Sequence, residues 1–542
     1  MKKMIYATIY TMDRDHPTAE AMGIEEDHIF FTGTREEARA IEVDESLAYP
    51  DQVILPGFID THVHVIPSGL FMTGADLSQA EDLAEVLELL RAKAAETPEG
   101  KWVIGAFFQD KHIKEKRFPN RYELDSVSTK HPIFICHNDL HPFSFNSEAL
   151  ALLGFDPALD GVCTDENGEL TGCIVDPACV DSLERIYAFF SDEDLLKGCE
   201  AVDQMAAASG VTTIFGKDSI RVLKLREQNK ERFRAEFKPM WMTYNTKDWE
   251  GLREILEDEA LREKTCICTF ADGAFDGWSA SVIEPYEGRP TEFGMLLNTD
   301  EELYEFAKAA RAHDLQFSTH AIGDHAIEQV IRVYERVLKE NPKEDHRFRI
   351  EHFELPTKQS VKKAAELGIA LGMQPLLIEI CEGMDLSGYA CFIGDRAGKC
   401  SPYRSILDAG ILVGGGTDFP VTPMRPLHGA RICMTQPTAS ERITLMECLE
   451  MNTCNAAKLG FLEDRKGMLR PGMDADFIVL DQNPFAVPVE ALSDIKVEQT
   501  YARGKLVYAR VTGRVPPWIA WHELCLYIGQ QENQIFMQEQ NS

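Results

Sequence analysis

The chain has 542 residues, 44% of them hydrophobic, and carries 55 basic against 89 acidic side chains, which gives a formal net charge of −34. A chain of this length can bury a large core and is longer than most single compact domains. The acidic balance, without any dense Lys/Arg run, argues against a nucleic-acid partner or an anionic membrane surface, because both attract positive charge. We therefore expect a soluble, globular protein without a nucleic-acid or membrane partner.

Neither a targeting signal nor a membrane segment is evident. The N-terminal apolar stretch is short and interrupted by polar residues, which is not typical of a signal peptide. No apolar run is long enough to span a bilayer. The 14 cysteines are scattered and form no C-x-x-C pair, a pattern typical of a reducing compartment. These features predict a cytoplasmic protein.

The two ends of the chain share one pattern. Residues 1–57 contain short alternating segments such as MIYATIYTM and HIFFTG, and residues 466–515 contain DADFIVLD and TYARGKLVY. Such alternation, without a long helix, predicts half-buried strands. We expect these two ranges to form one small β-sandwich domain. Residues 516–542 give no clear signal and are treated as a C-terminal tail.

Between these ends, apolar stretches of strand length alternate with segments of helical periodicity. Eight such stretches occur, at residues 58–64, 133–137, 211–216, 266–271, 315–320, 347–352, 369–374 and 411–416. One of the helical segments, TDEELYEFAKAARAHD, begins with Thr299 and Glu302 in the spacing of a capping box. Eight alternating units predict an α/β fold, a (β/α)8 TIM barrel over residues 58–465. The long connections at about 65–210 predict an insert over the strand ends.

Five possible metal ligands lie at the ends of these predicted strands. His62 and His64 end the first strand, His320 the fifth and His352 the sixth, and Asp418 follows the eighth. Each alone has an ordinary explanation, since a strand-end histidine is commonly structural and Asp418 could cap a turn. Active sites of such barrels lie at the C-terminal ends of the strands, so all five converge on one rim. They predict a divalent metal site, most simply zinc, with one or two ions per chain.

Longer motifs carry a resemblance to a known family. The stretches LPGFIDTHVH, HAIGDHAIEQVIRVYE, RIEHFEL, GTDFPV, NTCNAAKLG and GMLRPGMDADFIVLD resemble signatures of the amidohydrolase superfamily of metal-dependent hydrolases, over nearly the whole chain. PNRYELD, HNDLHPFSFNSEAL and FADGAFDGWSA are similar to the branch with N-substituted formamide deformylase-like and exoenzyme-regulatory proteins.

The resemblance implies a role for each predicted ligand. It places His62 and His64 on the first metal, makes His320 and His352 further ligands, and makes Asp418 both a ligand and a proton carrier. Metal chemistry agrees with these roles: a bound divalent ion lowers the pKa of water to about 7 and polarises a carbonyl oxygen. Asp418 could then pass the proton of that water to the departing amine.

One position departs from the family pattern. Related two-metal enzymes often bridge their ions with a carboxylated lysine on the fourth strand, and the resemblance places it four residues before Asp272. This chain has Cys268 there. Three arrangements remain open: Cys268 is itself a thiolate ligand, Lys217 just after the third strand supplies a carbamate, or one tightly bound ion has no bridge.

The hypothesis is therefore a metal-dependent amidohydrolase that cleaves a non-peptide C–N bond, an amide or N-substituted formamide, of a small molecule. Possible substrate-binding residues are His141, Asp272 and Trp278. A cyclic amide or imide hydrolase, or a deaminase, would use the same residues. An inactive binding or regulatory protein is the alternative outside enzymes. The resemblance also allows a homodimer.

Overall fold

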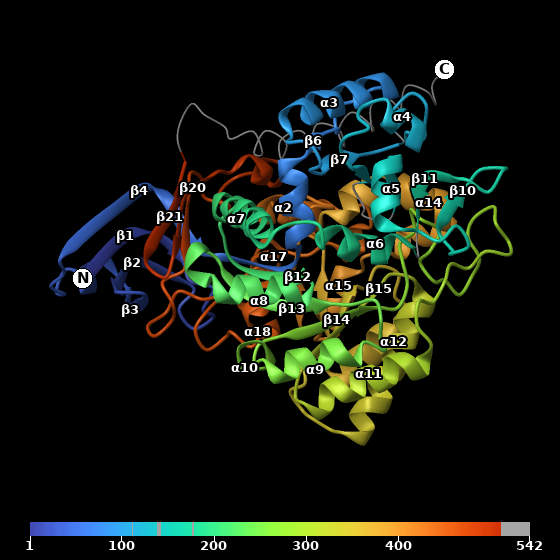
Figure 1. The fold of residues 1–542 in the computed structure, drawn as a ribbon. Helices are drawn as coiled ribbons and strands as arrows, with labels where there is room; N and C mark the ends of the chain where they lie inside the picture. The colour runs from blue at the N-terminus through green and yellow to red at the C-terminus, as the bar shows by residue number, and fades with distance from the viewer. Residues whose placement is uncertain (111, 138–141, 176–177, 511–542) are drawn as a thin grey trace, which may run out of the picture. The chain divides into compact units, whose positions relative to one another are not determined.

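The computed structural model describes residues 1–510 except 111, 138–141 and 176–177 (Figure 1). The chain divides into two compact units, one formed by Met1–Val63 with the chain from Asp203 onward, the other by His64–Val202. Within the described residues, no helix is long and apolar enough to cross a membrane. The predicted tail, residues 516–542, lies outside the described part.

Eight parallel strands form the barrel of the first unit. In sheet order they are β5 (Phe58–His64), β12 (Val211–Asp218), β13 (Glu236–Met242), β14 (Cys266–Phe270), β15 (Gln316–Ala321), β16 (Arg349–His352), β17 (Ala370–Met373) and β18 (Val413–Gly415). The circle closes where the backbone N–H of Asp418 donates to the His62 carbonyl at 2.8 Å. Val63 and Phe419 form a parallel bridge at the same place. The predicted (β/α)8 barrel is confirmed.

One predicted barrel strand is wrong and one was missed. Residues 133–137 do form a strand, β8 (Ile133–His137), but it belongs to the sheet of the second unit. The missing barrel strand is β13, whose sequence EFKPMWM contains Pro239 and begins with a charged residue. Proline lacks the N–H that a ladder uses, so a proline within a short run disfavours a strand prediction. The predicted number of strands was right only because these two errors cancel.

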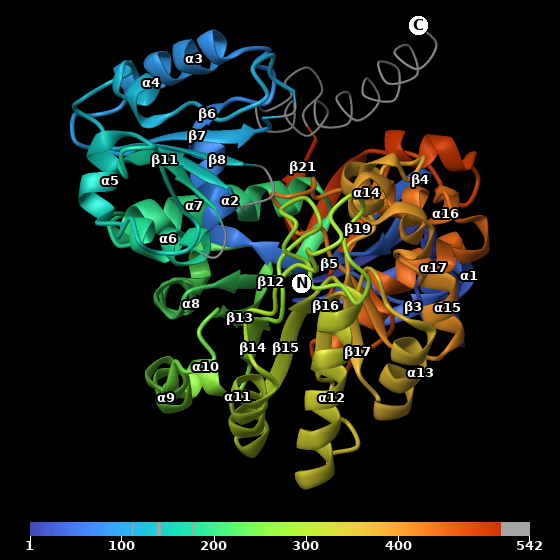
Figure 2. The same cartoon turned by 90° about the vertical axis from the view of Figure 1, so that its right-hand side faces the viewer.

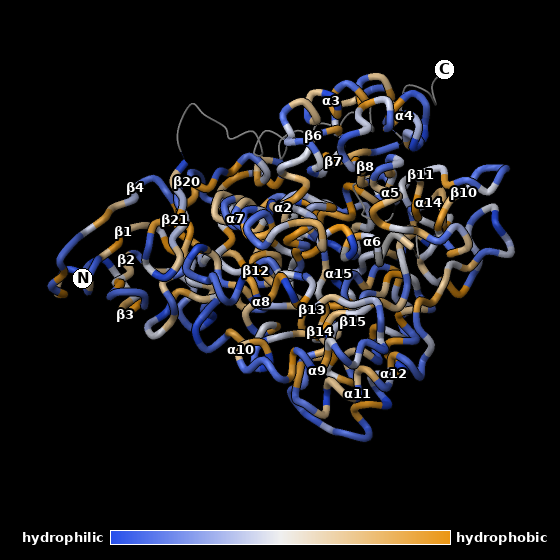
Figure 3. The backbone as a smooth tube through the Cα atoms, in the orientation of Figure 1, coloured by the Kyte–Doolittle hydropathy of each residue, from blue (hydrophilic) through white to orange (hydrophobic). Residues whose placement is uncertain are grey.

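Helices surround the barrel strands on the outside (Figure 2). They are α8 (Ile220–Gln228), α9 (Trp249–Glu257), α10 (Glu259–Arg262), α11 (Asp300–Ala312), α12 (Asp324–Glu340), α13 (Lys358–Leu367), α14 (Ser387–Ile393), α15 (Tyr403–Asp408), α16 (Pro426–Thr435), α17 (Leu445–Met451) and α18 (Cys454–Leu459). The predicted capping box of α11 is present, with Thr299 and Glu302 exchanging hydrogen bonds. Hydrophilic and hydrophobic residues alternate along α11 and α12, as expected of helices that bury one face (Figure 3).

Both chain ends contribute strands to one mixed sheet of seven strands, in the region where we predicted a small β-sandwich built from both ends. Its order is β21 (Lys505–Ala509), β20 (Val497–Ala502), β19 (Phe477–Leu480), β4 (Glu45–Pro56), β1 (Lys2–Tyr10), β2 (Thr18–Glu25) and β3 (His28–Gly33). The N-terminal and C-terminal strands lie side by side in Figure 1, and β19 pairs antiparallel with β4. Buried apolar side chains from both ends form one core. Because β4 leads directly into β5, this sheet fixes where the first barrel strand begins.

The second unit has its own six-stranded sheet and core. The sheet order is β10 (Val162–Thr164), β11 (Leu170–Ile174), β9 (Phe143–Phe145), β8, β7 (Val103–Phe108) and β6 (Ala75–Asp76). Its helices are α2 (Val65–Thr73), α3 (Leu83–Glu96), α4 (Arg121–Asp125), α5 (Ser147–Leu153) and α6 (Ala178–Tyr187), while α7 (Asp192–Ala208) continues into the first unit. The expected insert is therefore a folded unit, and its placement over the strand ends stays a prediction.

Candidate metal centre

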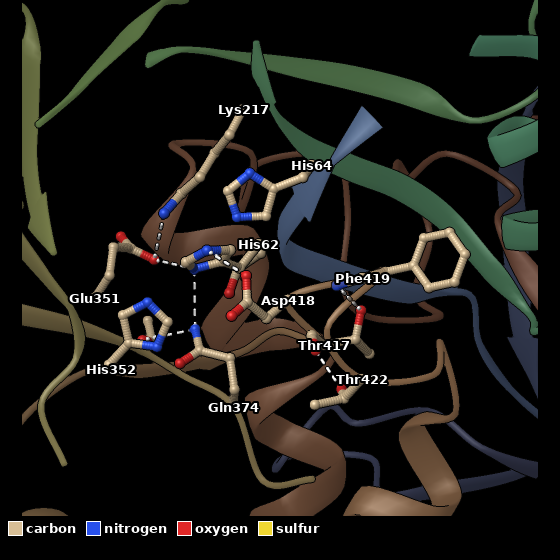
Figure 4. A network of polar contacts seen from close by, with 12 residues as sticks. His62, His64, Lys217, Glu351, His352, Gln374, Thr417, Asp418, Phe419 and Thr422 are labelled. Atoms are coloured by element: carbon tan, nitrogen blue, oxygen red, sulfur yellow. Dashed lines mark hydrogen bonds and ion pairs between the residues drawn. The ribbon is translucent and has the colours of Figure 1, made fainter. Parts of the chain in front are cut away.

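Three buried side chains at the C-terminal ends of the barrel strands form the candidate metal centre (Figure 4). His62 lies in β5, His352 is the last residue of β16, and Asp418 follows β18. Their ligand atoms all lie within 4.8 Å of one another. Barrel closure explains this convergence, because it brings β18 next to β5. The structure thus brings together three of the five predicted ligands.

His62 is held in one orientation by a carboxylate. Its Nδ1 lies 2.7 Å from Oε2 of Glu351, and its Nε2 lies 2.9 Å from Oδ1 of Asp418. A carboxylate on Nδ1 favours the tautomer with the proton on that nitrogen, which leaves the Nε2 lone pair for a metal. The Gln374 amide nitrogen also approaches Nδ1, at 3.0 Å. The imidazole is therefore fixed with Nε2 on the side of Asp418.

Glu351 can act in this way because buried cations keep it ionised. One guanidinium nitrogen of Arg349 donates to Oε2 at 2.9 Å, and the Lys217 ammonium lies 3.8 Å from the same oxygen. Complete burial alone would raise the pKa of Glu351, but Arg349 and Lys217 together hold it well below its usual range. Our prediction missed this residue. The signal for it was that Arg349 and Glu351 stand at alternate positions, and therefore on one face of the strand that ends at His352.

A second buried carboxylate fixes the junction between β5 and the chain around Asp418. Asp60 accepts hydrogen bonds from the backbone N–H groups of His62, at 3.1 Å, and Thr417, at 3.0 Å. Burial raises the pKa of Asp60 to about 6, although these hydrogen bonds oppose the rise. Gly416 is needed for the same close approach, because a Cβ there would lie 2.7 Å from the His62 Cβ. Sequence reasoning did not single out Asp60.

The backbone is strained at two of the three candidate ligands. His352 has a φ of 69° and Asp418 a φ of 60°. Residues other than glycine rarely adopt this left-handed conformation, which costs about 1–3 kcal/mol and persists only where the surroundings impose it. Such strain clusters at functional sites. Here the left-handed conformation occurs at His352 and Asp418, which lie at or just after the ends of β16 and β18 and whose side chains belong to the candidate metal centre.

The other two predicted ligands are not part of this group of three. His320, at the end of β15, has its Nε2 3.2 Å from the Gly273 carbonyl, and its ring centroid lies 4.4 Å from that of His352. His64 is the last residue of β5 and the first residue of the second unit. Their roles as ligands stay predictions.

Comparison with known proteins decides the family. The sequence profile of the amidohydrolase family matches residues 51–508. The chain belongs to the amidohydrolase family. Among its relatives is the N-substituted formamide deformylase of Arthrobacter pascens, which is 26% identical over an alignment of 543 positions that covers 94% of this chain and 98% of that protein. The Arabidopsis thaliana protein LONG AFTER FAR-RED 3 is 27% identical over an alignment of 540 positions that covers 92% of this chain and 90% of the relative.

Solved structures share the fold of this amidohydrolase. An uncharacterized metal-dependent hydrolase from Pyrococcus horikoshii OT3 superposes with a TM-score of 0.76 at 21% identity, covering 90% of this chain and 99% of the other. Family membership identifies the protein as a hydrolase that acts on carbon–nitrogen bonds. The predicted resemblance is confirmed, and the group of His62, His352 and Asp418 could hold a divalent metal.

The residues of this amidohydrolase fit such an ion. Two imidazoles and one carboxylate are the ligand types that zinc and similar ions prefer, and three protein ligands leave a position open for reaction. Nδ1 of His352 is buried, and no hydrogen-bond partner for it occurs in the described part of the chain.

Lys217 and Cys268 lie together inside the barrel of the amidohydrolase. Lys217 belongs to β12, the second barrel strand, and not to the end of the third as predicted, whereas Cys268 lies in β14. Both residues are buried, and the Lys217 ammonium lies close enough to Cys268 to act on the charge of its thiol. Burial raises the pKa of the Cys268 thiol, which the nearby Lys217 ammonium only partly offsets. The lysine therefore enters the barrel from a different strand than the family pattern implies.

Asp272 has backbone partners that explain its burial without a substrate. Its carboxylate accepts hydrogen bonds from the backbone N–H groups of Ser281 at 2.8 Å, Ile322 at 3.0 Å and Gly323 at 2.9 Å. These contacts tie the chain after β14 to the end of β15. Substrate contact by Asp272 stays a prediction.

Trp278 packs among aromatic side chains in the segment after β14. Its ring centroid lies 4.7 Å from that of Phe392, and the Arg289 guanidinium lies 3.7 Å from the ring centroid. His141, the remaining predicted substrate-binding residue, lies outside the described residues. Neither prediction of substrate contact is tested by this geometry.

Proposed function

We propose that this amidohydrolase uses zinc to hydrolyse the amide or N-substituted formamide bond of a small molecule. The observation that carries the proposal is the buried group of His62, His352 and Asp418, with His62 held by Glu351 at 2.7 Å. The relative from Arthrobacter pascens, named N-substituted formamide deformylase, supports the choice of substrate class. The negative charge of the chain supports a small-molecule substrate and not a polyanion.

Each residue of the centre has a defined task in this mechanism. When bound, the ion supplies the Lewis acidity that lowers the pKa of a water and polarises the substrate carbonyl. His62, His352 and Asp418 would hold it. Asp418 accepts a proton at its carboxylate and returns it to the departing nitrogen, which is ordinary general acid–base chemistry. Glu351 keeps the proton of His62 on Nδ1, so that Nε2 remains a ligand.

We propose that one ion is bound tightly and has no bridging ligand. Among the described residues, only one group of three possible ligands is close enough to hold an ion. The buried Lys217 ammonium pairs with Glu351 and already places a positive charge beside the centre. Metal analysis tests this proposal: we expect about one zinc per chain, unchanged in Lys217→Ala and Cys268→Ala. Two ions per chain, reduced to one in either variant, would identify that residue as a bridge.

A substrate panel tests the reaction itself. Zinc-loaded protein is incubated with N-substituted formamides, N-acyl amines and cyclic amides, and amine release is measured. We expect turnover of formamides or linear amides and a loss of at least about 100-fold in Asp418→Asn, the lower range for a general acid–base group. Turnover of cyclic amides alone would favour the alternative hydrolase. Full turnover by Asp418→Asn would refute the role of Asp418.

A further inference from the structure

Two buried polar atoms face each other behind the metal centre. Nδ1 of His352 and Oε1 of Glu354 lie 3.9 Å apart, with side-chain exposures of 4% and 3%. Neither atom has a hydrogen-bond partner in the described part of the chain. A buried polar group without a partner costs about 1–3 kcal/mol, so two such atoms side by side require an explanation. Neither the family comparison nor the sequence motifs assign a role to Glu354.

The rest of Glu354 is held in place by neighbours. The Tyr389 hydroxyl donates to its other carboxylate oxygen, Oε2, at 2.6 Å. The backbone N–H of Ser401 donates to its carbonyl at 2.7 Å. Tyr389 comes from α14 and Ser401 from the chain before α15, so two separate segments position this carboxylate. Oε1 is the atom left over, and it lies on the side of His352.

The backbone between the two residues is shaped for this approach. In a strand, residues two apart are separated by roughly 7 Å along the chain. His352 and the next residue, Phe353, instead have φ values of 69° and 53°. Two consecutive left-handed residues turn the chain after β16, where the Phe353 N–H donates to the Glu351 carbonyl at 2.9 Å, and the Glu354 carboxylate lies beside the His352 ring. The conformation is unfavourable for both residues, so the surrounding contacts must impose it.

The pair repeats the arrangement already described at His62. There, the Glu351 carboxylate lies on Nδ1 and leaves Nε2 for the ion. We propose that Glu354 is a positioning residue of the same kind, whose Oε1 accepts the N–H of His352 Nδ1 and so directs Nε2 of His352 to the metal. The 3.9 Å separation is longer than a hydrogen bond, and such contacts commonly tighten only when a site is filled. The inference rests on the proposed metal function of the centre.

Three variants separate this role from simple packing. Glu354→Ala removes the acceptor. Glu354→Gln keeps it, because the amide oxygen can face His352 while the amide N–H donates to the Tyr389 hydroxyl. Glu382→Gln is the matched control, since Glu382 is also a buried acid but accepts its hydrogen bond from Ser401 and forms no ion pair with a histidine of the described residues.

The measurement is the zinc dissociation constant, obtained by competition with a chromophoric chelator, together with the visible spectrum of the cobalt-substituted protein. We expect Glu354→Ala to bind zinc about 10–100-fold more weakly and to change the cobalt spectrum, as is typical when the partner of a ligand histidine is lost. Glu354→Gln should retain most of the affinity. Glu382→Gln should match the wild type in both measurements.

Each other outcome overturns the inference. Unchanged zinc affinity in Glu354→Ala would mean that the carboxylate does not position His352. Equal losses in all three variants would mean that the buried acids support packing only. A wild-type chain that takes up no zinc would overturn the proposed function as well, whereas the first two results leave that function standing.

Discussion

Replacing Glu351 by Gln should destabilise the protein strongly, even without metal. The carboxylate is fully buried and lies against Arg349, which is 0% exposed, and Lys217, which is 1% exposed. The substitution removes the negative charge but leaves both cations in the barrel interior. Breaking a buried ion pair on one side costs about 3–5 kcal/mol, because an uncompensated charge remains. We expect a loss of that size in the free energy of unfolding, measured by urea denaturation of metal-free protein.

An exposed ion pair provides the control. Arg336 and Glu301 lie 2.6 Å apart with side-chain exposures of 47% and 63%, so Glu301→Gln should change the free energy of unfolding by about 0–1 kcal/mol. Adding Lys217→Met to Glu351→Gln should recover part of the loss, since it removes one of the stranded cations. A loss below about 1 kcal/mol in Glu351→Gln would refute the assignment of Glu351 as their shared counter-ion.

Three further predictions concern pH, packing and metal removal. Burial raises the pKa of Glu382 from 4.5 to about 7, so the folded state loses stability as the pH rises between these values. Above pH 8, the free energy of unfolding of Glu382→Gln should therefore be about 3 kcal/mol higher than that of the wild type, and this gain should shrink toward pH 5. Glu36→Gln, at an exposed position, is the control and should show no such gain. Gly372→Ala would place its Cβ 2.6 Å from Oε2 of Glu351 and against Arg349, so thermal unfolding should show a loss of about 1–3 kcal/mol or more. Removal of the metal by a chelator should lower the melting temperature reversibly. Zinc at a hundred times its dissociation constant should raise the free energy of unfolding again by about 2.7 kcal/mol. A melting temperature that does not respond to zinc would contradict the metal centre.

The main features of the fold were predictable because their signals are local. Strand-length apolar runs and helical periodicity each lie within a few neighbouring residues, and they identified the barrel. The strand β13 was not predicted because it contains Pro239. Proline locally favours a loop, although the surrounding sheet imposes a strand here. His62, His352 and Asp418 were predictable because barrel geometry places all C-terminal strand ends on one rim.

The residues that support these ligands were not predictable in the same way. Glu351 matters because of His62, Lys217 and Arg349, and those partners come from β5, β12 and β16. Which side chains meet across a barrel depends on strand register, which no local pattern in one sequence specifies. The position of Glu354 depends instead on two left-handed residues, His352 and Phe353, which turn the chain after β16. A glutamate after a strand is otherwise most simply interpreted as a solvent-exposed residue.

The resemblance implies a lysine on the fourth barrel strand, but this chain has Cys268 there and a buried lysine, Lys217, on the second strand. At this level of the barrel, β14 carries the small Cys268 and β12 carries the long side chain of Lys217, and both are buried. The ammonium then meets Glu351 from another direction, at 3.8 Å. Since Glu351 orients His62, a residue on β12 acts on this candidate ligand through Glu351. The positive charge beside the candidate metal centre therefore comes from Lys217 on β12. The imidazole of His62 is still held by Glu351.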